Sequence, residues 1–372
     1  MRSNNRKPIM ATITRRELAF TGMAAAVALA TSSRVFSAAA ASQPSTAAAG
    51  ADQLRYVHPE LRPTILQFQQ MFAAQPSMSA DISAANLTER RDGFKSYFAP
   101  PAAQPAYAER MVPGPKGAPE VRTYVINAAA GAPRPAILHT HGGGYVSGTA
   151  AGGLHDLQEL AATLDCVVVT VDYRLAPETP FPGSLEDNYA ALRWLHAHAE
   201  ELGVDRERIA VMGESAGGGH AAMLAIAARD RGEVPLRFQS LIYPMLDDRT
   251  GSSRRMPAHI GNYIWTAGSN RFGWESFLGR KPGASSAPAG AVPARLQNLA
   301  GLPPAFIGVG AIDLFVDEDI EYARRLIAAG VATELQVVPG AFHAFDAIAR
   351  ETSIARQFTA AKVEALRRAF RS

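Results

Sequence analysis

The stretch IAVMGESAGGGH at residues 209–220 constrains the fold of this chain more than any other. Its first four residues are mostly apolar and predict a short buried strand, while the alanine-rich run 221–228 predicts a helix. The G-x-S-x-G motif between them puts Ser215 on a turn whose flanking glycines suit a backbone bent too sharply for side chains. This context is typical of a nucleophile elbow, which holds a serine hydroxyl above the edge of a sheet. On the motif alone, an ordinary turn with a solvated serine remains the alternative.

Predicted strands and helices alternate along most of the chain after residue 135. The strands are predicted at 136–140, 167–172, 209–212, 240–246, 305–312 and 334–338, and the helices at 154–164, 185–202, 221–228, 317–329 and 352–370. The strand at 167–172 is almost entirely β-branched, as expected where both faces of a strand are covered. This order predicts an α/β fold with a mostly parallel central sheet and helices on both faces.

Two stretches interrupt the alternation, one before about residue 110 and one from 247 to about 302. The first contains a predicted amphipathic helix at 62–72 and a predicted loop at 99–119, and an edge strand is predicted next, at 121–127. The second carries a group of aromatic side chains: Tyr263, Trp265, Phe272, Trp274 and Phe277. Insertions of this kind commonly form a lid, so we expect both stretches to cover a site at the sheet edge.

The N-terminal residues have the order of an export signal. Basic residues that include Arg15 and Arg16 precede an apolar run at 23–30, and small residues at 37–41 offer a cleavage site. The paired arginines resemble a twin-arginine signal, so we expect residues 1–41 to direct export to the periplasm or the extracellular space, followed by a linker at 43–50. The apolar run is too short to cross a bilayer, and no other segment reaches ~18 apolar residues.

Charge and cysteine content exclude several classes of protein. The net charge is +3, but residues 1–41 carry six basic side chains and one acidic one, so the remainder carries −2. Such a body gives no basic surface for nucleic acid or an anionic membrane, and we expect neither partner. The single cysteine, Cys166, excludes an intramolecular disulfide and is interpreted as a buried structural thiol. His196 and His198 point to different sides of a predicted helix, so we interpret both as surface residues and not as joint ligands of a metal ion. We expect no metal ion and no cofactor.

A second glycine cluster, HGGGYVSG at residues 141–148, directly follows a predicted strand. Consecutive glycines let backbone N–H groups approach a ligand, and acyl transfer needs such donors to hold the charge of a tetrahedral intermediate. We predict an oxyanion hole made by the N–H groups of Gly142, Gly143 and Ala216. A dinucleotide-binding loop is the rival interpretation, but Ser147 stands where the third glycine of G-x-G-x-x-G belongs.

A nucleophilic serine needs a histidine that takes its proton, and in this type of sheet that histidine follows the serine in the chain. Three histidines qualify: His220, His259 and His343. His220 is five residues beyond Ser215 on the same helix, about 140° around its axis, and cannot face the hydroxyl. His259 lies in the insertion, whereas His343 follows a predicted strand at the carboxyl end, where sites of open α/β sheets gather. We therefore predict His343 as the base.

Two aspartates stand at the carboxyl ends of predicted strands and compete for the role of the acid that orients His343. The position of Asp313 favours it only modestly over Asp247. The acidic residues at 317–319 open the next predicted helix, where the helix dipole explains them without a catalytic role.

Together these motifs resemble the bacterial hormone-sensitive-lipase family of α/β hydrolases between residues 120 and 350. The matching residues are HGGG at 141–144, YRLAPE at 173–178 with Phe181-Pro182, GESAGG at 213–218, Asp313 with Asp317-Glu318, and His343 with Phe345. The resemblance implies an α/β-hydrolase fold with a helical cap, and it assigns the acid to Asp313. The implied organisation is a signal at 1–41, a linker and first part of the cap at 42–110, and a catalytic domain at 111–372 with a cap insertion at about 247–302. The chain departs from the family in having Glu214 where Asp is common and Leu314 where Pro is common.

These inferences lead to one function as the main hypothesis. We expect a cofactor-free serine carboxylesterase that acts through Ser215, His343 and Asp313 and an acyl-enzyme, and the resemblance implies short- to medium-chain acyl esters as its substrates. An amidase, arylformamidase or lactonase with the same residues is the alternative, because all of them transfer an acyl group. A relative that only binds a small molecule is a further alternative. The expected partner is a small-molecule ester, and the sequence is compatible with a homodimer. Whether Tyr145 or Trp265 lines the acyl pocket is left open.

Overall fold

The computed structural model describes residues 53–73, 80–95 and 99–371. The expected export signal at 1–41 and the expected linker at 43–50 lie outside these residues. None of the described helices combines the length and the apolar character that crossing a bilayer needs.

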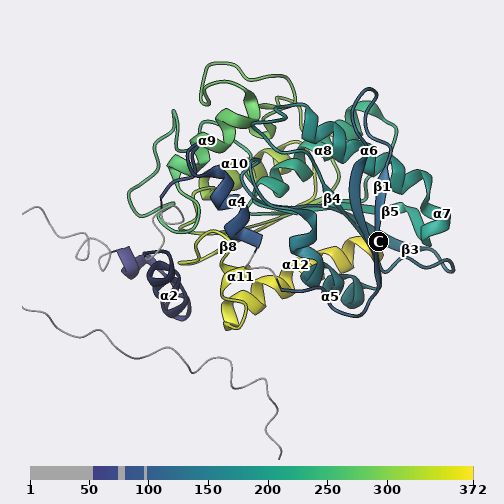
Figure 1. The fold of residues 1–372 in the computed structure, drawn as a ribbon, viewed down its shortest axis with the longest axis horizontal. Helices are drawn as coiled ribbons and strands as arrows, with labels where there is room; N and C mark the ends of the chain where they lie inside the picture. Colours follow the sequence, from purple (N-terminus) through teal and green to yellow (C-terminus); the bar gives the residue numbers. More distant parts are fainter. Residues whose placement is uncertain (1–52, 74–79, 96–98, 372) are drawn as a thin grey trace, which may run out of the picture. The chain divides into compact units, whose positions relative to one another are not determined.

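The described strands form one eight-stranded sheet in the order β1-β2-β4-β3-β5-β6-β7-β8 (Figure 1). Their bounds are β1 (Tyr107–Val112), β2 (Val121–Ile126), β3 (Arg134–Thr140), β4 (Val167–Asp172), β5 (Val204–Glu214), β6 (Phe238–Ile242), β7 (Ala305–Gly310) and β8 (Thr333–Val338). Strands β3 to β8 are parallel, while β2 is antiparallel to both β1 and β4. The prediction of an α/β fold with a mostly parallel sheet is confirmed.

The strand order reverses between β3 and β5. Strand β4 pairs with one edge of β3, and the chain then returns so that β5 pairs with the other edge. The connections after β3 and β5 therefore leave the sheet side by side and diverge, and such a switch point is where ligands of open α/β sheets bind. The glycine cluster follows β3 and Ser215 follows β5, so the topology brings these two motifs to one place.

Helices cover both faces of the sheet. The α-helices are α2 (Arg62–Ala73), α4 (Leu87–Lys95), α5 (Leu154–Leu164), α6 (Gly183–Ala197), α7 (Ala199–Leu202), α8 (Ala216–Arg231), α9 (Ala267–Leu278), α10 (Val316–Ala328), α11 (Phe345–Ile348) and α12 (Ser353–Arg371). Short 3₁₀ turns lie at Leu54–Tyr56, Pro59–Leu61, Ala150–Gly153 and Pro293–Arg295. The predicted helices at 62–72, 154–164, 317–329 and 352–370 are confirmed.

The core consists of two apolar clusters separated by the sheet. One contains Leu138 and Val211 with side chains of α6, α8 and α10. The other contains Ile137 and Ala210 with side chains of α5 and α12, and Figure 1 shows α6 and α8 on the opposite side of the sheet from these two helices. Neighbouring residues of one strand belong to different clusters because successive side chains point to opposite faces.

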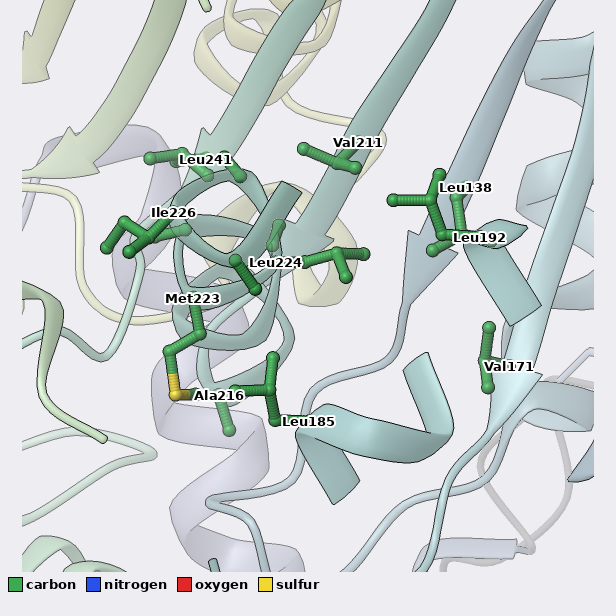
Figure 2. Packing of buried hydrophobic residues seen from close by; sticks show 14 of the residues in the cluster. Leu138, Val171, Leu185, Leu192, Val211, Ala216, Met223, Leu224, Ile226 and Leu241 are labelled. Atoms are coloured by element: carbon green, nitrogen blue, oxygen red, sulfur yellow. The ribbon is translucent and has the colours of Figure 1, made fainter. Parts of the chain in front are cut away.

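Helix α8 lies at the centre of the first cluster and is buried at every residue from Ala216 to Ala228. Figure 2 shows side chains that meet there: Leu185 and Leu192 of α6, Val211 and Leu241 of the sheet, and Met223, Leu224 and Ile226 of α8. A helix packed on all sides cannot shift without opening the core. The start of α8, directly after Ser215, is therefore held in a fixed position.

The prediction of a loop over 99–119 is wrong at residues 107–112, which form strand β1. β1 is the edge strand on this side of the sheet and β8 is the other edge, so the prediction that 121–127 is an edge strand is also wrong, and β2 lies inside the sheet. Most side chains of β1 are exposed, so the strand lacks an alternating apolar pattern. Backbone pairing with β2 defines this strand, which is why its sequence pattern did not reveal it.

Other boundaries differ from the prediction as well: β5 and α8 are longer than expected, and β7 ends at Gly310 instead of residue 312. The long helix expected at 185–202 is interrupted at His198 and forms α6 and α7. The strand expected at 240–246 ends at Ile242, because the next residue, Tyr243, has a φ of 36° that extended backbone does not allow. Asp247 is therefore several residues beyond the end of β6.

The two stretches that interrupt the alternation contact each other. The Ile82 N–H donates to Ser269 Oγ at 3.0 Å, and Thr266, which caps the N-terminus of α9, donates to the Asp81 carboxylate. The Arg91 guanidinium of α4 pairs with Glu178 and donates to the Val146 carbonyl at 2.7 Å. The N-terminal segment is thereby attached both to α9 and to the loop that carries the glycine cluster.

Candidate active site

Ser215 occupies the turn between β5 and α8 in a strained conformation, with φ 59° and ψ −123°. Such a backbone costs about 1–3 kcal/mol for a residue other than glycine and persists only when its surroundings hold it. Here the Ser215 N–H donates to the Ile242 carbonyl at 2.9 Å, and the Ser215 carbonyl accepts from the N–H groups of Gly219 and Met245. These bonds join the turn to the end of β6 and to the first turn of α8.

The two glycines of the motif leave room for the backbone to pack. A Cβ atom on Gly213 would lie 2.4 Å from the Gly217 carbonyl, and one on Gly217 would lie 2.0 Å from the Thr140 carbonyl oxygen. Both contacts are far shorter than real Cβ atoms show, so only glycine fits at either position. The sequence-based interpretation of these glycines is confirmed.

Ser215, His343 and Asp313 form one hydrogen-bonded line, although they come from three separate parts of the sheet edge. His343 Nε2 lies 2.9 Å from Ser215 Oγ, and His343 Nδ1 lies 2.8 Å from Asp313 Oδ2. All three side chains are buried. Because a carboxylate only accepts, Nδ1 carries the proton that it donates to Asp313, and neutral Nε2 is left to accept from the serine hydroxyl. This is the tautomer in which a histidine acts as a general base toward serine.

The ring of His343 is also held from its sides. Tyr243 and Phe315 contact it edge-on, with ring centroids 4.8 Å and 5.2 Å away. The next residue, Ala344, has a φ of 59°. Asp313 is fixed in turn, because its second oxygen accepts the Phe315 N–H at 3.0 Å. Strained backbone therefore occurs at Ser215, Tyr243 and Ala344, all within this one region.

The glycine loop lies directly behind the serine. A Cβ atom on Gly142 would lie 3.4 Å from Ser215 Cβ and 2.9 Å from the Glu214 carbonyl oxygen. Gly143 has a φ of 127°, which only glycine adopts readily. Ala216 follows the serine as the first residue of α8. Of the three residues predicted for the oxyanion hole, Gly142 and Ala216 are thus next to Ser215, and Gly143 follows Gly142 in the same loop.

His141 anchors the start of this loop. Its ring stacks on Tyr173 with centroids 4.1 Å apart, and the Tyr173 hydroxyl donates to the His141 carbonyl at 2.6 Å. Burial lowers the pKa of His141 to about 4, so the ring is neutral at pH 7. Tyr173 belongs to the YRLAPE stretch, so this stretch supports the loop from behind.

The competing candidates lie elsewhere. Asp247 is buried in an ion pair with Arg249 and Arg254, each 2.7 Å from its Oδ2. His220 is fully buried among aromatic rings, and burial lowers its pKa to about 3. His259 stacks on Tyr56.

Glu318 and Asp319, which the sequence explained by the helix dipole, are buried rather than exposed. Glu318 accepts the N–H groups of Leu246 and Asp247 at 2.6 Å and 3.1 Å. Burial raises the pKa of both carboxyl groups well above the usual range. Their place in the core was not visible from the sequence, because acidic residues at a helix start are ordinary.

Among the described residues, one group has the spacing of metal ligands. His155, Asp156 and Glu159 bring ligand atoms within 4.8 Å of one another at the surface. The Arg350 guanidinium already pairs with Asp156 at 2.8 Å and supplies the positive charge there. This group does not include His196 or His198, and His198 Nδ1 lies 2.9 Å from the Trp194 carbonyl.

The structure separates the two aromatic residues whose place the sequence left open. Tyr145 is core: its hydroxyl donates to the Met245 carbonyl at 2.8 Å, and its ring stacks on Phe277. The ring of Trp265, from the insertion, lies 6.5 Å from the ring of His343 and directly over Gly144.

A hollow of about 450 Å³ near Phe272 and Pro177 has none of the predicted site residues in its lining. The site is therefore identified by the hydrogen bonds among Ser215, His343 and Asp313 and not by this hollow.

Comparison with known proteins agrees with this geometry. A family model described as the alpha/beta hydrolase fold matches residues 137–347. Esterase LipI of Mycobacterium tuberculosis is 38% identical over 236 residues, 63% of this chain and 72% of LipI. Carboxylesterase NlhH of the same species is 39% identical over 244 residues, 63% of this chain and 74% of NlhH. The solved structure of a bacterial heroin esterase matches with a TM-score of 0.76 and 36% identity, covering 86% of this chain and 99% of that one. The chain belongs to the hormone-sensitive-lipase family of α/β hydrolases.

Proposed function

We propose that the protein is a serine carboxylesterase that hydrolyses short- to medium-chain acyl esters. The observation that carries the proposal is the buried line from Asp313 through His343 to Ser215, on a strained turn that faces a glycine loop. The relatives named esterase and carboxylesterase support ester hydrolysis as the reaction.

The mechanism follows from the chemistry of these groups. Ser215 Oγ attacks the ester carbonyl while His343 Nε2 accepts its proton, and the charge of the imidazolium is stabilised by Asp313. The N–H groups of Gly142, Gly143 and Ala216 hold the oxyanion of the tetrahedral intermediate, and each such donor contributes ~10²–10³-fold in rate. His343 then protonates the departing alcohol. A water molecule attacks the acyl-enzyme with His343 again as the base, and Ser215 is released.

We propose that the segment around 80–95 and the insertion at about 247–302 form a cap that limits the length of the acyl chain. Two contacts support this: the bond from Ile82 to Ser269, and the position of the Trp265 ring over Gly144 and 6.5 Å from the ring of His343. An aromatic wall this close to the reacting atoms leaves less room for a long or branched acyl group than for a short one.

The direct test compares wild type with Ser215→Ala on p-nitrophenyl acetate, butyrate, octanoate and palmitate. We expect activity to be highest on the short chains, and the variant to lose ~10³-fold or more in kcat/KM. Matched thermal melting curves control for misfolding. Equal, negligible activity of both proteins on every ester would contradict the proposal, and anilides, formamides and lactones would then be tried on the same pair.

A further inference from the structure

The residue before the nucleophile takes part in a hydrogen-bonded chain that crosses three strands. Glu214 Oε2 lies 2.8 Å from Nε2 of His139 on β3, and His139 Nδ1 lies 2.9 Å from Oγ1 of Thr170 on β4. His139 and Thr170 are buried, and Glu214 is partly buried. His139 stands three residues before Gly142. The chain of hydrogen bonds therefore joins the strand that carries the glycine loop to the strand that carries Ser215.

A second polar group lies beside the ring of His343. The Tyr243 hydroxyl donates to Asp346 Oδ1 at 2.9 Å, and Lys362 Nζ of α12 lies 3.7 Å from Asp346 Oδ2. The Tyr243 ring is the one that contacts His343 edge-on, and Asp346 stands three residues after His343.

The two groups meet at the junction of β5 and β6. Glu214 pairs in the sheet with Ile242, the neighbour of Tyr243 in the chain. Burial by itself raises the pKa of Glu214, but the nearby His139 and Lys362 more than offset this, and its pKa is lowered. Lys362 therefore interacts electrostatically with Glu214, and it also lies 3.7 Å from Asp346 Oδ2.

We propose that these two groups of side chains act as one set that positions Ser215 against His343. We name it the elbow brace; its members are His139, Glu214, Lys362, Asp346 and Tyr243. None of them takes a step in the proposed reaction, Tyr243 contacts only the side of the His343 ring, and the inference rests on the proposed esterase function. The physical need for a brace is the strained turn at Ser215, since a misplacement of about 1 Å at a reacting group costs ~10²-fold in rate.

The test uses Glu214→Ala and Asp346→Ala, which remove one carboxylate from each group of the brace, on different elements. Each is expected to lower kcat on p-nitrophenyl butyrate by ~10–100-fold with KM within ~3-fold, because substrate contacts stay intact. Their double variant is expected to be no more than ~3-fold slower than the slower single variant, because residues of one network are not additive. Glu214→Gln keeps a hydrogen bond to His139 and should retain more activity than Glu214→Ala, and it also serves if the latter fails to fold.

Leu366→Ala is the matched control. Leu366 is fully buried one turn beyond Lys362 on α12 and belongs to the core on that face. Its replacement by alanine therefore destabilises the helix without removing a member of the brace. Its kcat should equal that of wild type. The proposal is overturned if the two brace variants behave like Leu366→Ala, or if their losses multiply in the double variant.

A second readout separates this inference from the proposed function. The rate at which a fluorophosphonate labels Ser215 reports the alignment of serine and histidine even if no ester is turned over. An inert wild type that labels rapidly would refute the esterase proposal alone. Equal labelling rates of wild type and Glu214→Ala would refute the brace.

Discussion

At the scale of single residues, Asp313 and Asp247 are the two candidates for the acid that orients His343, and each serves as the control for the other. Asp313 accepts from His343 Nδ1, whereas Asp247 is neutralised by Arg249 and Arg254. We expect Asp313→Asn to lower kcat by ~10²–10⁴-fold, because the amide favours the wrong tautomer of the histidine. Asp247→Asn should keep kcat/KM within ~3-fold but lower the free energy of unfolding by about 1–3 kcal/mol. Steady-state kinetics with urea unfolding checks both, and the opposite pattern would make Asp247 the acid.

His220 gives a prediction about acid stability. Its pKa is lowered by burial to about 3 in the folded protein, against 6.5 when unfolded. Below pH 6.5 the unfolded chain therefore binds a proton that the folded chain refuses, and stability falls as the pH falls. Between pH 7 and pH 5 this one group lowers the free energy of unfolding by about 2 kcal/mol.

His220→Leu removes this group and also removes two buried ring nitrogens that have no hydrogen-bond partner. Between pH 7 and pH 5, we expect the free energy of unfolding of the variant to fall by about 2 kcal/mol less than that of wild type. Urea unfolding at the two pH values measures this. Parallel losses in the two proteins would mean that His220 is not the buried neutral group described above.

At the scale of elements, the sequence was most informative where burial and pattern agree. The β-branched run at Val167–Asp172 and the helix Leu154–Leu164 have the predicted bounds, because both lie in the core and display their periodicity. Helix α9 was missed because it contains Gly268, Ser269, Asn270 and Gly273, which are poor helix formers. Its cap at Thr266 and the burial of Trp274 and Phe277 hold it instead, and such tertiary support is invisible in a single sequence.

The insertion that contains α9 also carries Trp265, which gives a prediction at this scale. We expect Trp265→Ala to raise the ratio of kcat/KM for the octanoate ester to that for the butyrate ester by ~10-fold, because it removes the indole beside Gly144 and His343. Trp274→Phe is the control within α9, since Trp274 is fully buried against Tyr145 and Phe277. An unchanged ratio in Trp265→Ala would remove Trp265 from the acyl pocket.

At the scale of the whole molecule, the candidate site was more predictable than the details of the fold around it. The glycine cluster, Ser215, Asp313 and His343 were found because motifs and parallel-sheet topology together restrict where reactive groups gather. The choice between Asp313 and Asp247 needed the family resemblance, because both follow predicted strands. The hydrogen bond of Glu214 was beyond reach, since its partner His139 comes from a distant part of the chain and no motif links the two residues.

The expected export signal gives the last prediction, for residues outside the described structure. A twin-arginine signal is an address read by a receptor, so the identity of both arginines matters and not only their charge. Replacing Arg15 and Arg16 with lysine keeps the charge, and we expect it to leave the esterase activity in the cytoplasmic fraction of a bacterial host. Arg2→Lys with Arg6→Lys is the control, because those arginines lie outside the pair, and it should leave the activity in the periplasmic fraction or the medium. If both double variants are exported equally well, the paired arginines are not the address, and a signal that depends on charge alone would explain the basic N-terminus.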